Sequence, residues 1–199
     1  MWRTELRSGL AHVGQALRTP EDFAQAWHNG SAKYSWWVWG SLVATAIVGT
    51  TTYGMTMGLL GDTTDVLRKG LACSLGAGLS WGLALPALYV LNSLSGSRLP
   101  AGSTLLAALV TTSWGGLAMI ASTPINWFFS VAVPHPLFVL AVNLVVFAGV
   151  GIAMTDVFHR VMLRLEPQRV AATWWLALVA VIGCELFYLF GLFNFPLPV

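Results

Sequence analysis

The stretch from Leu137 to Phe158 reads LFVLAVNLVVFAGVGIAMTDVF and decides the fold class. Its 22 residues include one ionisable side chain, Asp156, close to the end of the stretch. A helix of about 20 apolar residues crosses the roughly 30 Å hydrocarbon core of a lipid bilayer. At that depth every backbone polar group needs a partner within the chain, and a helix supplies these partners. The stretch therefore predicts a transmembrane helix.

The composition of the whole chain agrees with this prediction. Of its 199 residues, 56% are hydrophobic and only 9% are charged, and the mean hydropathy is +0.71. In a soluble domain about a quarter of the residues are charged. The composition excludes a disordered chain, a coiled coil and almost any water-soluble enzyme. The net charge of +2 is too small to imply a nucleic-acid partner.

Four further stretches have the length and apolar character of membrane spans. We therefore predict an all-α polytopic membrane protein whose five transmembrane helices form one domain, residues 34–199. The predicted spans cover about residues 36–59, 71–94, 103–123, 137–158 and 174–193. Prolines flank the segment from Ile125 to His135, which predicts a short interfacial elbow between the third and fourth spans.

The first 33 residues are predicted to form a separate amphipathic segment at the cytoplasmic membrane surface. Apolar residues recur at helical spacing among arginines, a pattern typical of a helix that lies in the lipid headgroup layer. A helix that binds a partner protein instead is the alternative. A second short helix is predicted to begin at Pro20 and to end before Asn29 and Gly30. The apolar residues of the first helix are Trp2, Leu6, Leu10, Val13 and Leu17.

The positions of the basic residues predict the orientation in the membrane. Eight of the ten Lys and Arg residues lie before the first span, between spans two and three, or between spans four and five. Since cytoplasmic loops are rich in Lys and Arg, we predict a cytoplasmic N-terminus and an outer C-terminus. Four tryptophans are expected to anchor spans one and five at the cytoplasmic interface: Trp36, Trp37, Trp174 and Trp175.

Glu185 is the one acidic residue deep inside a predicted span. A carboxylate in hydrocarbon is costly, so we expect Glu185 to face the interior of the helix bundle. Asn143 and Thr112 are candidate hydrogen-bonding neighbours in such an intramembrane polar site, and Ser113 and Ser80 are further candidates. Two interpretations stay open: a neutral acid that bonds a neighbouring helix, and a proton or cation site.

Rows of small residues predict the faces on which helices approach one another closely. Such residues let two helix backbones come together, whether inside one chain or with a partner chain. The predicted packing residues are Gly54, Gly58, Ser74, Gly78, Gly82 and Gly115.

The sequence contains no pattern of residues that predicts a catalytic or metal site. The two cysteines, Cys73 and Cys184, lie in separate apolar stretches, and the four histidines do not face one another within the spans. We therefore expect no enzymatic activity, no metal site and no cofactor.

Several short stretches resemble the Yip family, the Rab-interacting five-span membrane proteins, and in particular its bacterial branch. The stretches are residues 53–58 (YGMTMG), the pair Arg68 and Lys69, residues 86–92 (PALYVLN), residues 121–125 (ASTPI) and residues 183–186 (GCEL). Two departures stand out. Glu185 occupies a place where an amide is expected, and residues 191–193 (GLF) replace an expected Arg-Pro-Phe.

The resemblance implies a membrane-embedded adaptor without enzymatic chemistry, located in the cytoplasmic (inner) membrane of a bacterium. Together with the rows of small residues, it leads us to expect a non-catalytic scaffold or accessory subunit of a larger membrane complex. Its expected partners are the lipid bilayer and either other membrane subunits or further copies of the chain. The alternative function is a small proton-coupled or cation-coupled transporter or channel that uses Glu185.

Overall fold

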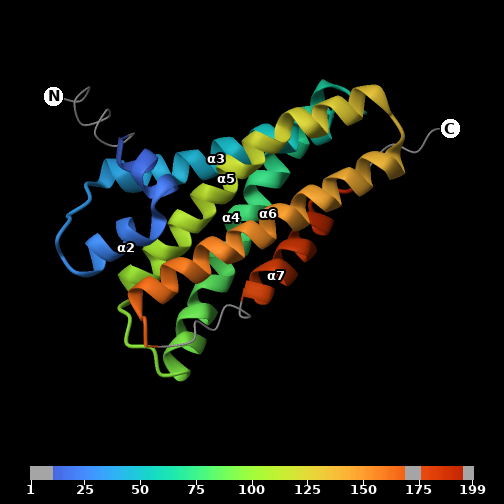
Figure 1. Cartoon of the computed structure of the whole chain (residues 1–199). Coiled ribbons are helices and arrows are strands. Elements are labelled where there is room, and N and C mark those ends of the chain that lie inside the picture. Colours follow the sequence, from blue (N-terminus) through green and yellow to red (C-terminus); the bar gives the residue numbers. More distant parts are fainter. Residues whose placement is uncertain (1–10, 169–175, 195–199) are drawn as a thin grey trace.

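The computed structural model describes residues 11–168 and 176–194, and every regular element in this part of the chain is a helix (Figure 1). Residues 11–18 are helical. The helices that follow are α2 (Pro20–His28), α3 (Trp36–Met57), α4 (Thr63–Leu94), α5 (Ala101–Ala132), α6 (Pro136–Leu165) and α7 (Leu176–Leu189).

Three of the described helices, α4, α5 and α6, are long and apolar enough to cross a membrane. Helix α7 is a shorter apolar helix of 14 residues. The prediction of an all-helical protein with apolar helices of membrane-spanning length is confirmed for these three elements.

Helix α5 is longer than the sequence predicts. It continues through Pro124 to Ala132, so the expected elbow from Ile125 to His135 is wrong. Proline removes one backbone donor, and neighbouring groups in a membrane bundle can compensate for that loss. Only the short segment from Val133 to His135 connects α5 to α6.

The long helices lie side by side, with α2 at one end of the bundle (Figure 1). Helix α3 packs against both α4 and α5, α5 packs against α6, and α4 packs against α7. Two glycines allow α3 and α5 to cross closely, because a Cβ atom on Gly49 would overlap the backbone of Gly116. Gly49 was not among the packing residues predicted from the sequence.

Helix α2 begins and ends where the sequence predicts. Pro20 occupies its first turn and precedes the acidic pair Glu21 and Asp22. The helix ends at His28, and Gly30 follows with a φ of 69°, a left-handed conformation that glycine adopts without strain.

The apolar residues that precede α2 face the bundle. Val13 is buried and Leu17 is partly buried in a cluster that also contains Phe23, Leu42 and Leu106. The prediction that this face rests on lipid is therefore wrong for Val13 and Leu17, because α3 and α5 cover it. The remaining predicted apolar residues, Trp2, Leu6 and Leu10, lie outside the described residues.

Ion pairs and an aromatic stack hold α2 at the end of the bundle. Arg160 on α6 pairs with Glu21, and Arg164 pairs with Asp22 at 3.2 Å. Tyr34 stacks on Phe23 with ring centroids 4.1 Å apart, and its hydroxyl donates a 2.9 Å hydrogen bond to the Phe23 carbonyl. Burial raises the pKa of Tyr34.

Candidate functional site

Glu185 lies on the outward face of α7 and is exposed. The prediction that it faces the interior of the bundle is wrong. Gly183, two residues earlier, is buried on the side of α7 that lies against α4, close to Ser80. Because successive helix residues are 100° apart, a residue two positions from Gly183 points about 200° away from α4. Packing through the glycine therefore turns the carboxyl group outward.

Contacts between α7 and α4 give the level of Glu185 along the bundle. Gly183 lies beside Ser80, and Phe187 lies beside Gly76, so Glu185 lies near the level of residue 78 of α4. Residue 78 is the midpoint of the helix Thr63–Leu94. At 1.5 Å per residue, Glu185 is roughly 23 Å from the level of either end of that helix. If α4 spans the bilayer, the carboxyl group is at mid-depth.

The structure does not bring Glu185, Asn143 and Thr112 together into one site. Thr112 donates hydrogen bonds to the carbonyls of Ala108 and Leu109 in its own helix. Asn143 is fully buried between helices, where its amide donates a 2.7 Å hydrogen bond to the carbonyl of Val139. The predicted three-residue polar site is therefore wrong, although Asn143 does belong to a buried polar network.

That network connects the C-terminal end of α3 to α5 and α6. The hydroxyl of Tyr53 donates a 2.8 Å hydrogen bond to Oδ1 of Asn143. The side-chain amide of Asn126 donates a 2.7 Å hydrogen bond to Oγ1 of Thr56, and Oγ1 of Thr56 donates to the carbonyl of Tyr53. All four side chains are buried. Sequence reasoning missed Asn126, because it placed this residue in the expected interfacial elbow.

Lys69 is buried beside the same helix end. Its Nζ donates a 3.3 Å hydrogen bond to the carbonyl of Met57, the last residue of α3. The C-terminal end of a helix carries partial negative charge, which favours a cation. Lys69 was predicted in a loop outside the membrane spans, but it lies in the second turn of α4.

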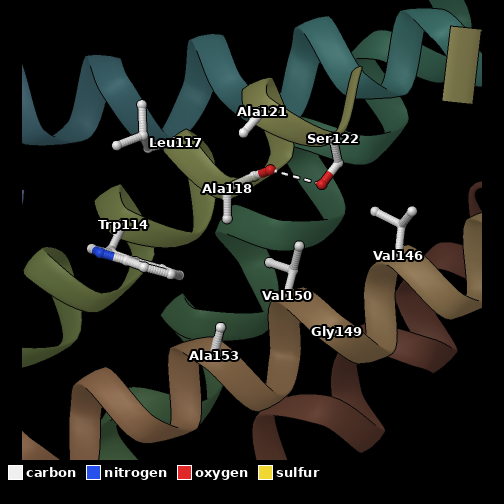
Figure 2. Close-up of a pocket in the computed structure, with 9 residues that line it drawn as sticks. All are labelled: Trp114, Leu117, Ala118, Ala121, Ser122, Val146, Gly149, Val150 and Ala153. Carbon is white, nitrogen blue, oxygen red and sulfur yellow. Dashed lines mark hydrogen bonds between the residues drawn. The ribbon is translucent and has the colours of Figure 1, made fainter. Parts of the chain in front are cut away.

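An apolar cavity of about 470 Å³ lies between α5 and α6 (Figure 2). Trp114 lies at one end, and small and branched aliphatic residues of both helices, such as Ala118, Gly149 and Val150, line the rest. Ser122 is the one polar aliphatic side chain in the lining, and its hydroxyl donates a 2.9 Å hydrogen bond to the Ala118 carbonyl. The residues that line the cavity therefore offer apolar contacts to a ligand, and none of them is charged.

The predicted packing residues fall into two groups. Gly54 and Gly58 lie against α4, and Gly115 lies against the side chain of Met154 on α6, so these three contact neighbouring helices as expected. Gly78 and Gly82 face outward, with no atom within 4 Å of a Cβ built on either of them. Helix packing among the described residues therefore does not use these two glycines. Ser74 is half-buried on α4.

The tryptophans predicted at the membrane interface are described in part. Trp36, the first residue of α3, is 68% exposed, and its ring centroid lies 4.0 Å from the ring centroid of Trp37. Trp174 and Trp175 lie outside the described residues.

The part of the chain that the structure describes contains no group of three His, Cys, Asp or Glu side chains that could hold a metal ion. Of the two cysteines, Cys73 is buried beside Gly54, and Cys184 is exposed next to Glu185 on α7. No protein-family model, curated protein or solved structure matches the chain.

Proposed function

We propose that this chain is a non-catalytic integral membrane protein of five spans, of the Yip-like type, that acts as a scaffold or accessory subunit of a larger membrane complex. The observation that carries this proposal is the outward position of Glu185 on an apolar helix. A carboxyl group in hydrocarbon costs about 2.5–3.5 kcal/mol on insertion scales. A contact with a partner helix relieves this cost, whereas the chain's own bundle lies on the opposite side of α7.

Contacts within the fold support a cytoplasmic N-terminus in the inner membrane. The segment 95–100 and the C-terminal end of α6 meet, since the backbone N–H of Arg98 donates a 3.0 Å hydrogen bond to Glu166. Arg160 and Arg164 join α2 to the same end. Arg68 lies in α4 toward the other end of the bundle. The basic segments thus gather at one end, as the positive-inside rule requires of the cytoplasmic side.

Two features of α3 and α7 support their assignment as spans. Helix α3 has 22 residues and packs along both α4 and α5, and α7 packs along α4. A helix packed alongside a membrane-crossing helix shares its environment. Residues before α7 extend the predicted fifth span, and they lie outside the described residues.

The alternative function, a proton or cation pathway through Glu185, requires at least two copies of the chain. Glu185 lies on the outer face of α7, so the described part of a single copy does not enclose it. The flux of protons into liposomes that contain the purified chain separates the two functions. For a transporter, the Glu185→Gln substitution should abolish the proton flux. For a scaffold, the wild-type chain should already show no proton flux.

Purification of the full chain from its native membrane in a mild detergent tests the proposed function. We expect a complex larger than the monomer, which Glu185→Leu releases into monomers. Leu144→Ala, at another exposed position on α6, is the control and should leave the complex intact. A wild-type chain that always elutes as a lone monomer contradicts the proposal.

A further inference from the structure

We propose that Glu185 pairs with a Lys or Arg side chain at mid-depth on a transmembrane helix of a different protein. This inference rests on the proposed function and names the chemistry of the partner. It is drawn from the level of Glu185, from the residues around it and from the positions of the cations in this chain.

The level of Glu185 requires a partner group inside the hydrocarbon. Glu185 lies beside the midpoint of the 32-residue helix α4, so a bilayer centred on this helix places it far from both headgroup layers. Water and lipid headgroups therefore do not reach it without deforming the bilayer. A side chain on another helix at the same depth is the group that can bond the carboxylate.

The surface around Glu185 has the character of a helix-binding face. Val181 is 61% exposed, Tyr188 is 72% exposed and Leu189 is 71% exposed, and all three lie within one turn of Glu185. These side chains lie on the face of α7 opposite Gly183, which is buried against α4. The carboxyl group thus sits at the centre of an apolar stripe, where a pairing cation would be shielded from lipid.

A second copy of the chain lacks the complementary charge at this depth. The sequence contains no Lys or Arg between Lys69 and Arg98, or between Arg98 and Arg160. Lys69 lies about nine residues from the level of Glu185 along α4, or roughly 14 Å. Two copies in the same orientation would instead bring like acids together. Charge complementarity therefore favours a different protein over a homodimer.

Designed transmembrane peptides test the chemistry directly. We would reconstitute the full chain in liposomes with Leu/Ala peptides that carry one central Arg, one central Gln or no polar residue, and measure association by energy transfer between fluorescent labels. We expect the Arg peptide to bind about tenfold more tightly than the apolar peptide. Glu185→Gln should remove most of this preference, and the control Leu144→Gln should not change it.

Charge reversal provides the second arm. The Glu185→Lys chain should no longer bind the Arg peptide and should bind a peptide with one central Glu. The wild-type chain should not bind the Glu peptide. Energy transfer between two labelled copies of the chain tests the homodimer in the same liposomes.

The outcomes separate this inference from the proposed function. One outcome is that the native complex depends on Glu185 but the wild-type chain binds all the peptides equally. Pairing of Glu185 with a Lys or Arg of the partner is then ruled out, and the proposed scaffold function is retained. If two copies associate through Glu185, the inference is overturned in favour of a homo-oligomer. If the chain is monomeric in native membranes and binds no peptide, both proposals fail.

Discussion

Tyr53 on α3 and Asn143 on α6 are joined by a 2.8 Å hydrogen bond between the Tyr53 hydroxyl and Oδ1 of Asn143, and both side chains are fully buried. These residues are 90 positions apart in the chain. The bond links two helices at the end of the bundle where Asn126 and Lys69 are also buried. A buried hydrogen bond of this kind stabilises one arrangement of the helices over others, because its loss leaves a polar atom without a partner.

The first prediction concerns this bond. Tyr53→Phe removes the hydroxyl and leaves Oδ1 of Asn143 without its donor, so we expect the free energy of unfolding to fall by about 0.5–2 kcal/mol. Equilibrium unfolding in detergent measures the change. Thr155→Val, which removes a hydroxyl that bonds within α6, is the control and should change stability less. A Tyr53→Phe protein with wild-type stability would show that the bond contributes nothing.

The second prediction compares a glycine packed against another helix with two glycines that face open space. Gly49→Ala places a methyl group into the backbone of Gly116, so α3 and α5 must separate, and we expect a loss of about 2 kcal/mol or more. Gly78→Ala and Gly82→Ala add a methyl group in open space and should stabilise the isolated chain by up to about 1 kcal/mol, because alanine favours a helix. Thermal unfolding measures all three. Equal losses at the three positions would contradict the packing described for α3 and α5.

The third prediction concerns the ion pairs that hold α2. Both pairs are partly exposed, so replacement of Arg160 and Arg164 by Ala should lower global stability by less than about 1 kcal/mol. The same double variant should speed cleavage near α2 by a protease, because the contact between α2 and α6 is local. Rising salt concentration should have a similar effect on the wild-type chain. Charge exchange across the pair of Arg164 and Asp22 should restore the protection that this pair supplies, and failure of this rescue would assign the effect to lost packing.

The fourth prediction concerns pH and Tyr34. Burial raises the pKa of Tyr34 in the folded state above its ordinary value of about 10. The folded state thus favours the neutral phenol, so this stabilisation is complete below the unfolded pKa and is lost as the pH rises through the folded pKa. Docking of α2 should therefore weaken at strongly alkaline pH, and Tyr34→Phe should remove this part of the dependence. Tyrosinate absorbance and protease cleavage measured in parallel check it, and an unchanged alkaline transition in Tyr34→Phe contradicts it.

Local rules predicted α2 and the apolar helices well. Proline at the first turn of α2 and Asn29-Gly30 after its end are signals that act over a few residues, so the boundaries could be read directly. The same local reasoning failed at Pro124. Whether a proline ends a helix depends on the groups that surround it, and those groups come from other parts of the chain.

The candidate site was identified by residue type but not by position. An acid in an apolar stretch is unusual, so residue type alone marks Glu185 as a candidate. The sequence does not show the direction in which its side chain points. The burial of Asn126 was missed because the third span was predicted to end at residue 123, whereas α5 continues to Ala132. The burial of Lys69 was missed because the second span was predicted to begin at residue 71, whereas α4 begins at Thr63.

Composition and the lengths of the apolar stretches determined that this is a helical chain with segments able to cross a membrane, because bilayer thickness and backbone hydrogen bonding leave little choice of structure. The direction in which each helix points its residues was decided only by the tertiary structure. Gly183 packs against α4 and turns Glu185 outward, while Gly78 and Gly82 remain uncovered. In an apolar chain the hydrophobic pattern does not distinguish a helix face that contacts another helix from one that contacts lipid. Close packing between helix backbones therefore decides which face of each helix points into the bundle.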